Sequence, residues 1–207
     1  MQKKRISFHQ QPSRASVRVV CDALRQRYGT SDLDNPSDPL DDLIFIILSA
    51  RTSISIAREI YLNLRQRFDS WCHLINEDRK ETEEILRRGG LESIKTDQIH
   101  SALLTIRNAF GSCTLEPLRN FDQSEAERFL TDLSGVSLKT AKCVMMYTLG
   151  FRVLPVDTHV HRISKRLGWT SKNRADQCHN ELESLVPAGK RYDFHVNCIL
   201  HGRELCR

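Results

Sequence analysis

The chain has 207 residues, of which 40% are hydrophobic and 28% are charged, and its formal net charge is +5. This length is enough for one domain or two small ones with a buried core, and the composition excludes a disordered chain. The longest apolar run, Leu43–Leu48, is much shorter than the about 20 residues that cross a bilayer, which excludes a membrane-spanning protein. The positive charge permits nucleic-acid binding without demonstrating it.

The N-terminus and the cysteines indicate the compartment. Residues 1–13 carry Lys3, Lys4 and Arg5 but no apolar segment, so we expect a basic flexible tail and no secretion signal. The seven cysteines, an odd number, are scattered singly and do not form the framework of a small secreted domain. We therefore expect a soluble protein of a reducing compartment, which is the cytoplasm (nucleoid) if the source is bacterial or archaeal.

Helical periodicity runs through nearly the whole chain. A first helix follows from Ser16 and stops at Gly29, and a polar connection with two prolines leads to the apolar run at 43–48. That run alone fits a buried strand or a buried helix, but the four-residue spacing from Ile56 to Phe68 that follows it favours helix. No segment alternates as a half-buried strand does, so the predicted fold class is all-α, with roughly ten helices. Later helices are predicted over 81–88, 99–110, 125–133, 138–149, 158–167, 175–186 and 192–200.

The most informative segment joins two of these helices and reads Leu133-Ser-Gly-Val-Ser-Leu-Lys-Thr-Ala-Lys142. Gly135 lets the backbone turn tightly because it has no Cβ, and the turn aims consecutive N–H groups outward at the start of the next helix. Those amides and the positive end of the helix dipole suit a DNA phosphate. The hairpin, with Gly135 and Ser137, is therefore a candidate for sequence-independent binding to the DNA backbone.

This hairpin resembles the helix-hairpin-helix of the endonuclease III family of DNA glycosylases and AP lyases. The resemblance continues through Val156-Asp-Thr-His-Val-His-Arg162 and on to His201-Gly-Arg203 and Cys206. Upstream, Leu48-Ser-Ala-Arg-Thr52 and Gly90-Leu91 match further segments of that family. The similarity therefore extends over nearly the whole chain and is more specific than a single motif.

The resemblance implies a two-lobed, all-α helix-hairpin-helix glycosylase fold. One lobe, residues 40–151, would be a six-helix barrel that contains the hairpin at 125–150, and the other would combine residues 14–39 with 152–207. Double-stranded DNA with damaged bases or abasic sites would lie across the cleft between the lobes. The resemblance implies no membrane association, and we expect a monomer.

Lys139 matches the nucleophile of the family. A neutral amine can displace a damaged base at the sugar C1′ and remain as a Schiff base, which permits strand cleavage by β-elimination. A helix N-terminus and partial burial both favour the neutral amine that this attack needs. A lone lysine near a helix start would be interpreted as a surface residue. In this motif the resemblance implies a bifunctional glycosylase/lyase, because family members that only remove bases have no lysine here.

Asp157 is the second candidate catalytic residue. It directly precedes a predicted helix, so on its own it would be interpreted as an N-cap that binds orphan backbone N–H groups. The resemblance implies that its carboxylate also takes a proton from the amine and stabilises the oxocarbenium-like sugar. One residue can do both.

Four further positions are candidates for DNA contact. By resemblance, Leu91 is the apolar wedge that fills the space left by an extruded base, and Arg51 stands where the family usually has a gap-filling glutamine. Without the resemblance, Leu91 would be a core residue and Arg51 a surface residue. His159 and Arg162, which follow Asp157, fit phosphate contacts and a solvated helix face equally well.

Several positions depart from the family's pattern. Ser134 replaces a usual proline, and Ser137 replaces a glycine, so Ser137 would be strained if its φ were positive. Lys142 replaces an asparagine, and Ile54 stands where an aspartate is common. Together with Arg51, these departures bear on which base is recognised more than on the chemistry.

The 4Fe–4S cluster typical of the family would take Cys206 as its first ligand. One thiolate cannot hold a cluster that needs four, so we expect that either the sequence is truncated or this member has lost the cluster. The other six cysteines are interpreted as small buried apolar residues. A zinc site built from His195, Cys198, His201 and Cys206 is a less favoured alternative, because the spacing matches no zinc-finger pattern.

We therefore predict a base-excision repair glycosylase with AP lyase activity that removes a damaged base, a pyrimidine by resemblance. Two alternatives stay open. The first is a mismatch-type or abasic-site-only lyase, and the second is a non-catalytic duplex DNA-binding module.

Overall fold

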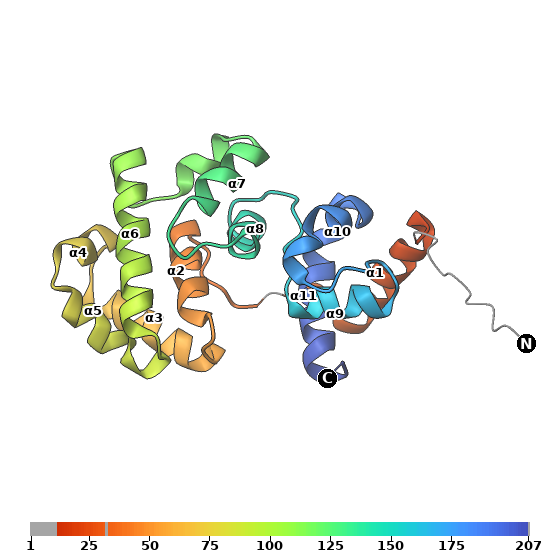
Figure 1. The fold of residues 1–207 in the computed structure, drawn as a ribbon, viewed down its shortest axis with the longest axis horizontal. Helices are drawn as coiled ribbons and strands as arrows, with labels where there is room; N and C mark the ends of the chain where they lie inside the picture. The colour runs from red at the N-terminus through yellow and green to blue at the C-terminus, as the bar shows by residue number, and fades with distance from the viewer. Residues whose placement is uncertain (1–11, 32, 207) are drawn as a thin grey trace, which may run out of the picture. The chain divides into compact units, whose positions relative to one another are not determined.

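The computed structural model describes residues 12–31 and 33–206, so residues 1–11 of the predicted basic tail lie outside the described residues. The described residues form α-helices and short 3₁₀ helices and no strand, which confirms the predicted all-α class (Figure 1). None of the described helices combines the length and the apolar character that crossing a bilayer requires. The chain divides into two compact units. Unit 1 takes the described parts of Met1–Ser31 and Val156–Arg207, and unit 2 those of Asp32–Pro155.

Unit 2 is built around helix α2. This helix packs against α3, α6 and α8, and its apolar residues are buried on every side. The helical alternative for the apolar run is therefore the one adopted. The elements of unit 2 are α2 (Pro39–Ser49), α3 (Ile54–Arg67), α4 (Trp71–Asn76), α5 (Arg79–Leu86), η1 (Arg87–Gly89), α6 (Glu92–Phe110), η2 (Glu116–Asn120), α7 (Gln123–Thr131) and α8 (Leu138–Tyr147).

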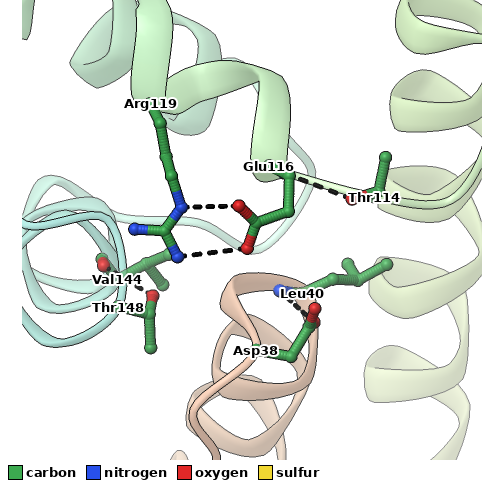
Figure 2. Close-up of polar contacts among 7 residues, drawn as sticks. All are labelled: Asp38, Leu40, Thr114, Glu116, Arg119, Val144 and Thr148. Carbon is green, nitrogen blue, oxygen red and sulfur yellow. Dashed lines mark hydrogen bonds and ion pairs between the residues drawn. The ribbon is translucent and has the colours of Figure 1, made fainter.

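The start of α2 explains why the apolar run is helical. The Asp38 side chain accepts a hydrogen bond from the Leu40 N–H at 2.9 Å, and Pro39 fills the first helical position, which needs no N–H donor. Figure 2 shows this cap close to an ion pair within η2, where Arg119 donates two hydrogen bonds to the Glu116 carboxylate. A capped N-terminus and burial on all sides together favour a helix over a strand.

Unit 1 packs α11 against both α1 and α9. Its core contains Trp169, whose ring stacks on Phe194 with 5.6 Å between the centroids. Helix α1 ends at Gly29, which has a φ of 75°, as the sequence predicts. The elements of unit 1 are α1 (Arg14–Tyr28), α9 (Thr158–Arg166), η3 (Ala175–Gln177), α10 (His179–Leu185), η4 (Ala188–Lys190) and α11 (Arg191–Glu204).

The structure differs from the sequence-based expectations in three respects. Helix α4 and the 3₁₀ helices η2 and η4 lie outside the predicted helices, because six, five and three residues are too few to display a helical period. The units meet in sequence at 31/32 and 155/156, where the predicted lobes meet at 39/40 and 151/152. Cys72 and Cys113, interpreted as isolated apolar residues, form a disulfide between α4 and the loop after α6. The other five cysteines are buried.

Candidate active site and nucleic-acid interface

The hairpin between α7 and α8 has the tight turn that the sequence predicts. Gly135 has a φ of 78°, and a Cβ at this position would lie 2.6 Å from the Gln98 side chain of α6, so a larger residue would be both strained and crowded. Ser137 caps α8, because its Oγ accepts a hydrogen bond from the Thr140 N–H at 3.2 Å. Its φ is −81°, so the serine that replaces a glycine here is unstrained.

Lys139 is the second residue of α8 and is half-buried. This position lies in the first turn of α8, at the positive end of the helix dipole, which is unfavourable for an added positive charge. A buried acidic group, which local sequence patterns do not reveal, lies within electrostatic range of this lysine. Asp42 of α2 is fully buried, and its interaction with the positive charge of Lys139 contributes to its ionisation. Unit 2 therefore places the predicted nucleophile within electrostatic range of an acidic group from a second helix.

The environment of Asp42 is unusual for a carboxyl group. Its Oδ1 accepts a hydrogen bond from the Asn35 amide at 2.7 Å, whereas its Oδ2 has no hydrogen-bond partner among the described residues. Burial raises the pKa of Asp42 to about 7, against the opposing effects of the Asn35 bond and the Lys139 charge. A buried carboxyl that titrates near neutrality beside a lysine is a common mark of a functional site.

Lys142, which departs from the family pattern, lies inside unit 2. Its side chain is only 3% exposed, and its Nζ lies 3.6 Å from a carboxylate oxygen of Glu127 on α7. The residue therefore ties α8 to α7 and is poorly placed for direct contact with a nucleic acid.

Asp157 caps α9 in unit 1. Its Oδ1 accepts hydrogen bonds from the backbone N–H groups of His159 and Val160 at 3.0 and 2.8 Å, which is the N-cap arrangement that the sequence predicts. The carboxylate is half-buried. The cap fixes the side chain in one orientation, so any proton transfer would use a pre-positioned carboxylate.

His159 and Arg162 are held within unit 1. Both are half-buried, and Arg162 donates a hydrogen bond to the Gly202 carbonyl of α11 at 3.2 Å. Burial lowers the pKa of His159. The nearby positive charges of Arg162 and Arg203 lower it further, whereas the negative charge of Asp157 opposes the shift. These side chains are therefore partly packed within unit 1. A lowered pKa disfavours the protonated form of His159, which makes it a weaker phosphate ligand than the sequence suggests.

We expect Gly202→Ala to destabilise the protein by about 1–3 kcal/mol, because a Cβ there would overlap Nδ1 of the His159 ring. The measurement is chemical denaturation. Gly189→Ala is the matched control, since no atom lies within 4 Å of its added Cβ. Combining His159→Ala with Gly202→Ala should recover part of the loss, and a Gly202→Ala variant as stable as the control would contradict the contact.

Arg51 and Leu91, the candidate base-reading residues, share a rare backbone conformation. Their φ angles are 56° and 58°, and among the described non-glycine residues only Asp34 also has a positive φ. Both side chains are exposed, and Leu91 is 42% accessible, so the reading of Leu91 as a core residue is excluded. Strained backbone that carries an exposed arginine and an exposed leucine favours a role in binding over a role in packing.

The residues near Cys206 do not fit a 4Fe–4S cluster. Cys206 is buried, and its Sγ accepts a hydrogen bond from Arg166. Burial raises the pKa of Cys21 to about 11 and that of Cys198 well above its usual range. Within residues 12–31 and 33–206, no three His, Cys, Asp or Glu side chains converge as metal ligands.

Comparison with known proteins gives the family. The model of the HhH-GPD superfamily of base excision DNA repair proteins matches residues 44–188, which include the hairpin, Lys139 and Asp157. The chain belongs to this superfamily. The predicted resemblance to endonuclease III is confirmed, since endonuclease III of Synechocystis sp. is 30% identical over 81% of this chain and 73% of its own length.

Other members of the superfamily extend the comparison. The Arabidopsis thaliana protein named "Putative DNA glycosylase At3g47830" is 34% identical over 79% of this chain, and the match spans 56% of that longer protein. The fold is shared with a non-covalent endonuclease III–DNA complex, at a TM-score of 0.80 and 23% identity over 95% of this chain and 89% of that one. A thermostable thymine-DNA glycosylase has a TM-score of 0.78 at 22% identity, over 93% and 88% of the two chains.

Proposed function

We propose that this chain is a DNA glycosylase with AP lyase activity, which removes a damaged pyrimidine through a Schiff base on Lys139 and then cleaves 3′ to the abasic site. One observation carries the proposal. The half-buried amine of Lys139 stands in the first turn of α8, directly after the hairpin and within electrostatic reach of buried Asp42. Membership in a superfamily of base excision DNA repair proteins supports the same chemistry.

The proposed reaction has two stages. The neutral Lys139 amine attacks C1′ as the bond from C1′ to the base breaks, and the base leaves with the electron pair and a proton. Ring opening then gives an imine between Lys139 and C1′. Loss of a C2′ proton breaks the bond to the 3′ phosphate, and water releases the unsaturated sugar from the lysine. In this scheme Asp157, held by its cap, stabilises the positive charge that develops on the sugar.

DNA binding is proposed at two parts of unit 2. The hairpin around Gly135 and Ser137 would bind phosphates through backbone N–H groups and the α8 dipole, independently of sequence. Arg51 and Leu91 would enter the base stack and occupy the space that the extruded nucleotide leaves, which offsets part of the few kcal/mol that unstacking costs.

The departures at Arg51 and Ile54, which are both exposed, favour one second candidate, a mismatch-type glycosylase or an abasic-site lyase with a different base preference. A candidate of another class is a non-catalytic duplex DNA-binding module. The proposed glycosylase/lyase and these two alternatives would each give different products, so one assay with defined lesions distinguishes all three.

The experiment is incubation with duplexes that each carry one lesion, mismatch or abasic site, analysed with and without hot alkali. Strand cleavage at an oxidised pyrimidine without alkali is the expected result. Cleavage there only after alkali would contradict the lyase step, and cleavage at mismatches or abasic sites alone would support the second candidate. Salt-dependent binding without any product would indicate the non-catalytic module.

A further inference from the structure

Two loops of unit 2 present the strained residues. The first connects α2 to α3 and contains Arg51, and the second is the turn from Gly89 to Leu91 before α6. Ile54 and Ile94, at the starts of α3 and α6, are also exposed, at 47% and 54%. The two loops, which lie about forty residues apart in sequence, thus both end in exposed apolar side chains at helix N-termini.

A buried lysine joins these loops. The Nζ of Lys95, in the first turn of α6, donates hydrogen bonds to the Leu48 carbonyl at 2.8 Å and to Thr52 Oγ1 at 2.7 Å. The Thr52 hydroxyl in turn donates to the Gly89 carbonyl at 2.7 Å. We call this chain of hydrogen bonds the Lys95–Thr52 clamp. Through the side chains of Lys95 and Thr52 it connects the loop of Arg51 to the backbone of the turn before Leu91.

Lys95 also holds the turn of Leu91 through its backbone. The Lys95 N–H donates to the Leu91 carbonyl at 2.8 Å, so one residue holds the turn of Leu91 with its backbone and the loop of Arg51 with its side chain. Gly89 fits closely against α3, because a Cβ there would lie 2.7 Å from Ile60 Cδ1. The hydrogen bonds of the clamp and the close packing of Gly89 on Ile60 therefore both constrain the spacing between the two loops.

Lys95 is only 3% exposed, and burying a lysine side chain there costs the free energy of removing its ammonium group from water. The two oxygens to which its Nζ donates are uncharged, and burial lowers the pKa of Lys95. The C-terminal end of α2 gives some compensation, because its last carbonyls carry partial negative charge. A structure that needed only packing here would be better served by an apolar side chain, so the three donors of the lysine point to a positioning role.

We propose that the Lys95–Thr52 clamp positions Arg51 and Leu91 at a fixed spacing, so that both enter the base stack together at one extruded nucleotide. Lys95 and Thr52 are positioning residues in this scheme and do not touch the reacting atoms. The inference rests on the proposed function in one respect, the insertion of Arg51 and Leu91 into DNA, and it does not depend on the Lys139 chemistry.

The test uses a duplex with a tetrahydrofuran abasic analogue opposite 2-aminopurine. The analogue has no aldehyde and forms no Schiff base, so the readout is independent of Lys139. Insertion of Arg51 and Leu91 should unstack the 2-aminopurine and raise its fluorescence. We expect Thr52→Val and Lys95→Met to lose most of this rise and to reduce the preference for the analogue over undamaged duplex about tenfold. Thr52→Ser, which keeps the hydroxyl, should restore both.

Thr105→Val on the exposed face of α6 is the matched control for the change of residue type, and binding to undamaged duplex controls for folding. The proposal is overturned if Thr52→Val behaves like Thr52→Ser, or if affinity for damaged and undamaged duplex falls by the same factor. If the wild-type chain traps no abasic DNA but the variants still differ from it in 2-aminopurine fluorescence as described, the result contradicts the proposed lyase chemistry and supports the clamp.

Discussion

Replacing Lys139 by Gln is expected to reduce borohydride trapping on abasic duplex DNA by at least ~100-fold. Reduction of an imine requires an amine bonded to C1′, and an amide in the first turn of α8 forms none. Binding to undamaged duplex should change little, because the hairpin backbone and not this side chain carries that affinity. The measurement is the covalent protein–DNA band on a denaturing gel.

Lys80→Gln is the matched control, since it makes the same substitution at an exposed lysine of α5. It should trap as the wild-type chain does. If Lys139→Gln retains the wild-type amount of trapped complex, then another amine is the nucleophile and the role assigned to Lys139 is wrong.

Asp42→Asn is expected to change how stability depends on pH. The pKa of Asp42 is raised from 3.8 to about 7, so between these values the folded protein binds a proton that the unfolded chain has released. The wild-type free energy of unfolding should therefore fall as pH rises from about 4 to 7, by about 4 kcal/mol from this group, and then stay level. Asparagine carries no titrating proton and removes this contribution.

The informative quantity is the wild-type minus variant difference in unfolding free energy, compared between pH 4 and pH 8. Constant effects of the substitution, such as the buried amide N–H₂ that replaces an unpartnered Oδ2, cancel in that comparison. Urea denaturation at several pH values provides the data, with Asp132→Asn as the exposed control. Parallel pH profiles for the wild type and Asp42→Asn would show that Asp42 is not the group held protonated.

The sequence predicts the all-α fold well, because the relevant signals are local. Helical spacing, a capping aspartate and a terminating glycine each act within one or two turns. Helix α1 shows the spacing and ends at Gly29, and helix α9 begins after the capping Asp157. The Gly135 turn is equally readable, since its left-handed backbone explains the glycine. The two-unit division is less sharply readable, because packing and not local pattern sets where one unit ends.

The parts of the candidate site that the sequence does not reveal depend on contacts between distant segments. Asp42 resembles an ordinary acidic residue in the first turn of a helix, and only its burial beside α8 makes it a partner of Lys139. Lys95 looks like a surface lysine until its Nζ is seen to bind Thr52, 43 residues away. A charged residue within an apolar helical stripe was the one available signal in both cases.

The measurement that tests the proposed function most directly is peptide mapping of the reduced complex by tandem mass spectrometry. The wild-type chain is incubated with abasic duplex and borohydride, digested with nuclease and protease, and searched for the residual sugar adduct. We expect the added mass on Lys139, within the first turn of α8. An adduct on a different amine, or no adduct from a chain that still binds the duplex, would contradict a Schiff-base mechanism at Lys139.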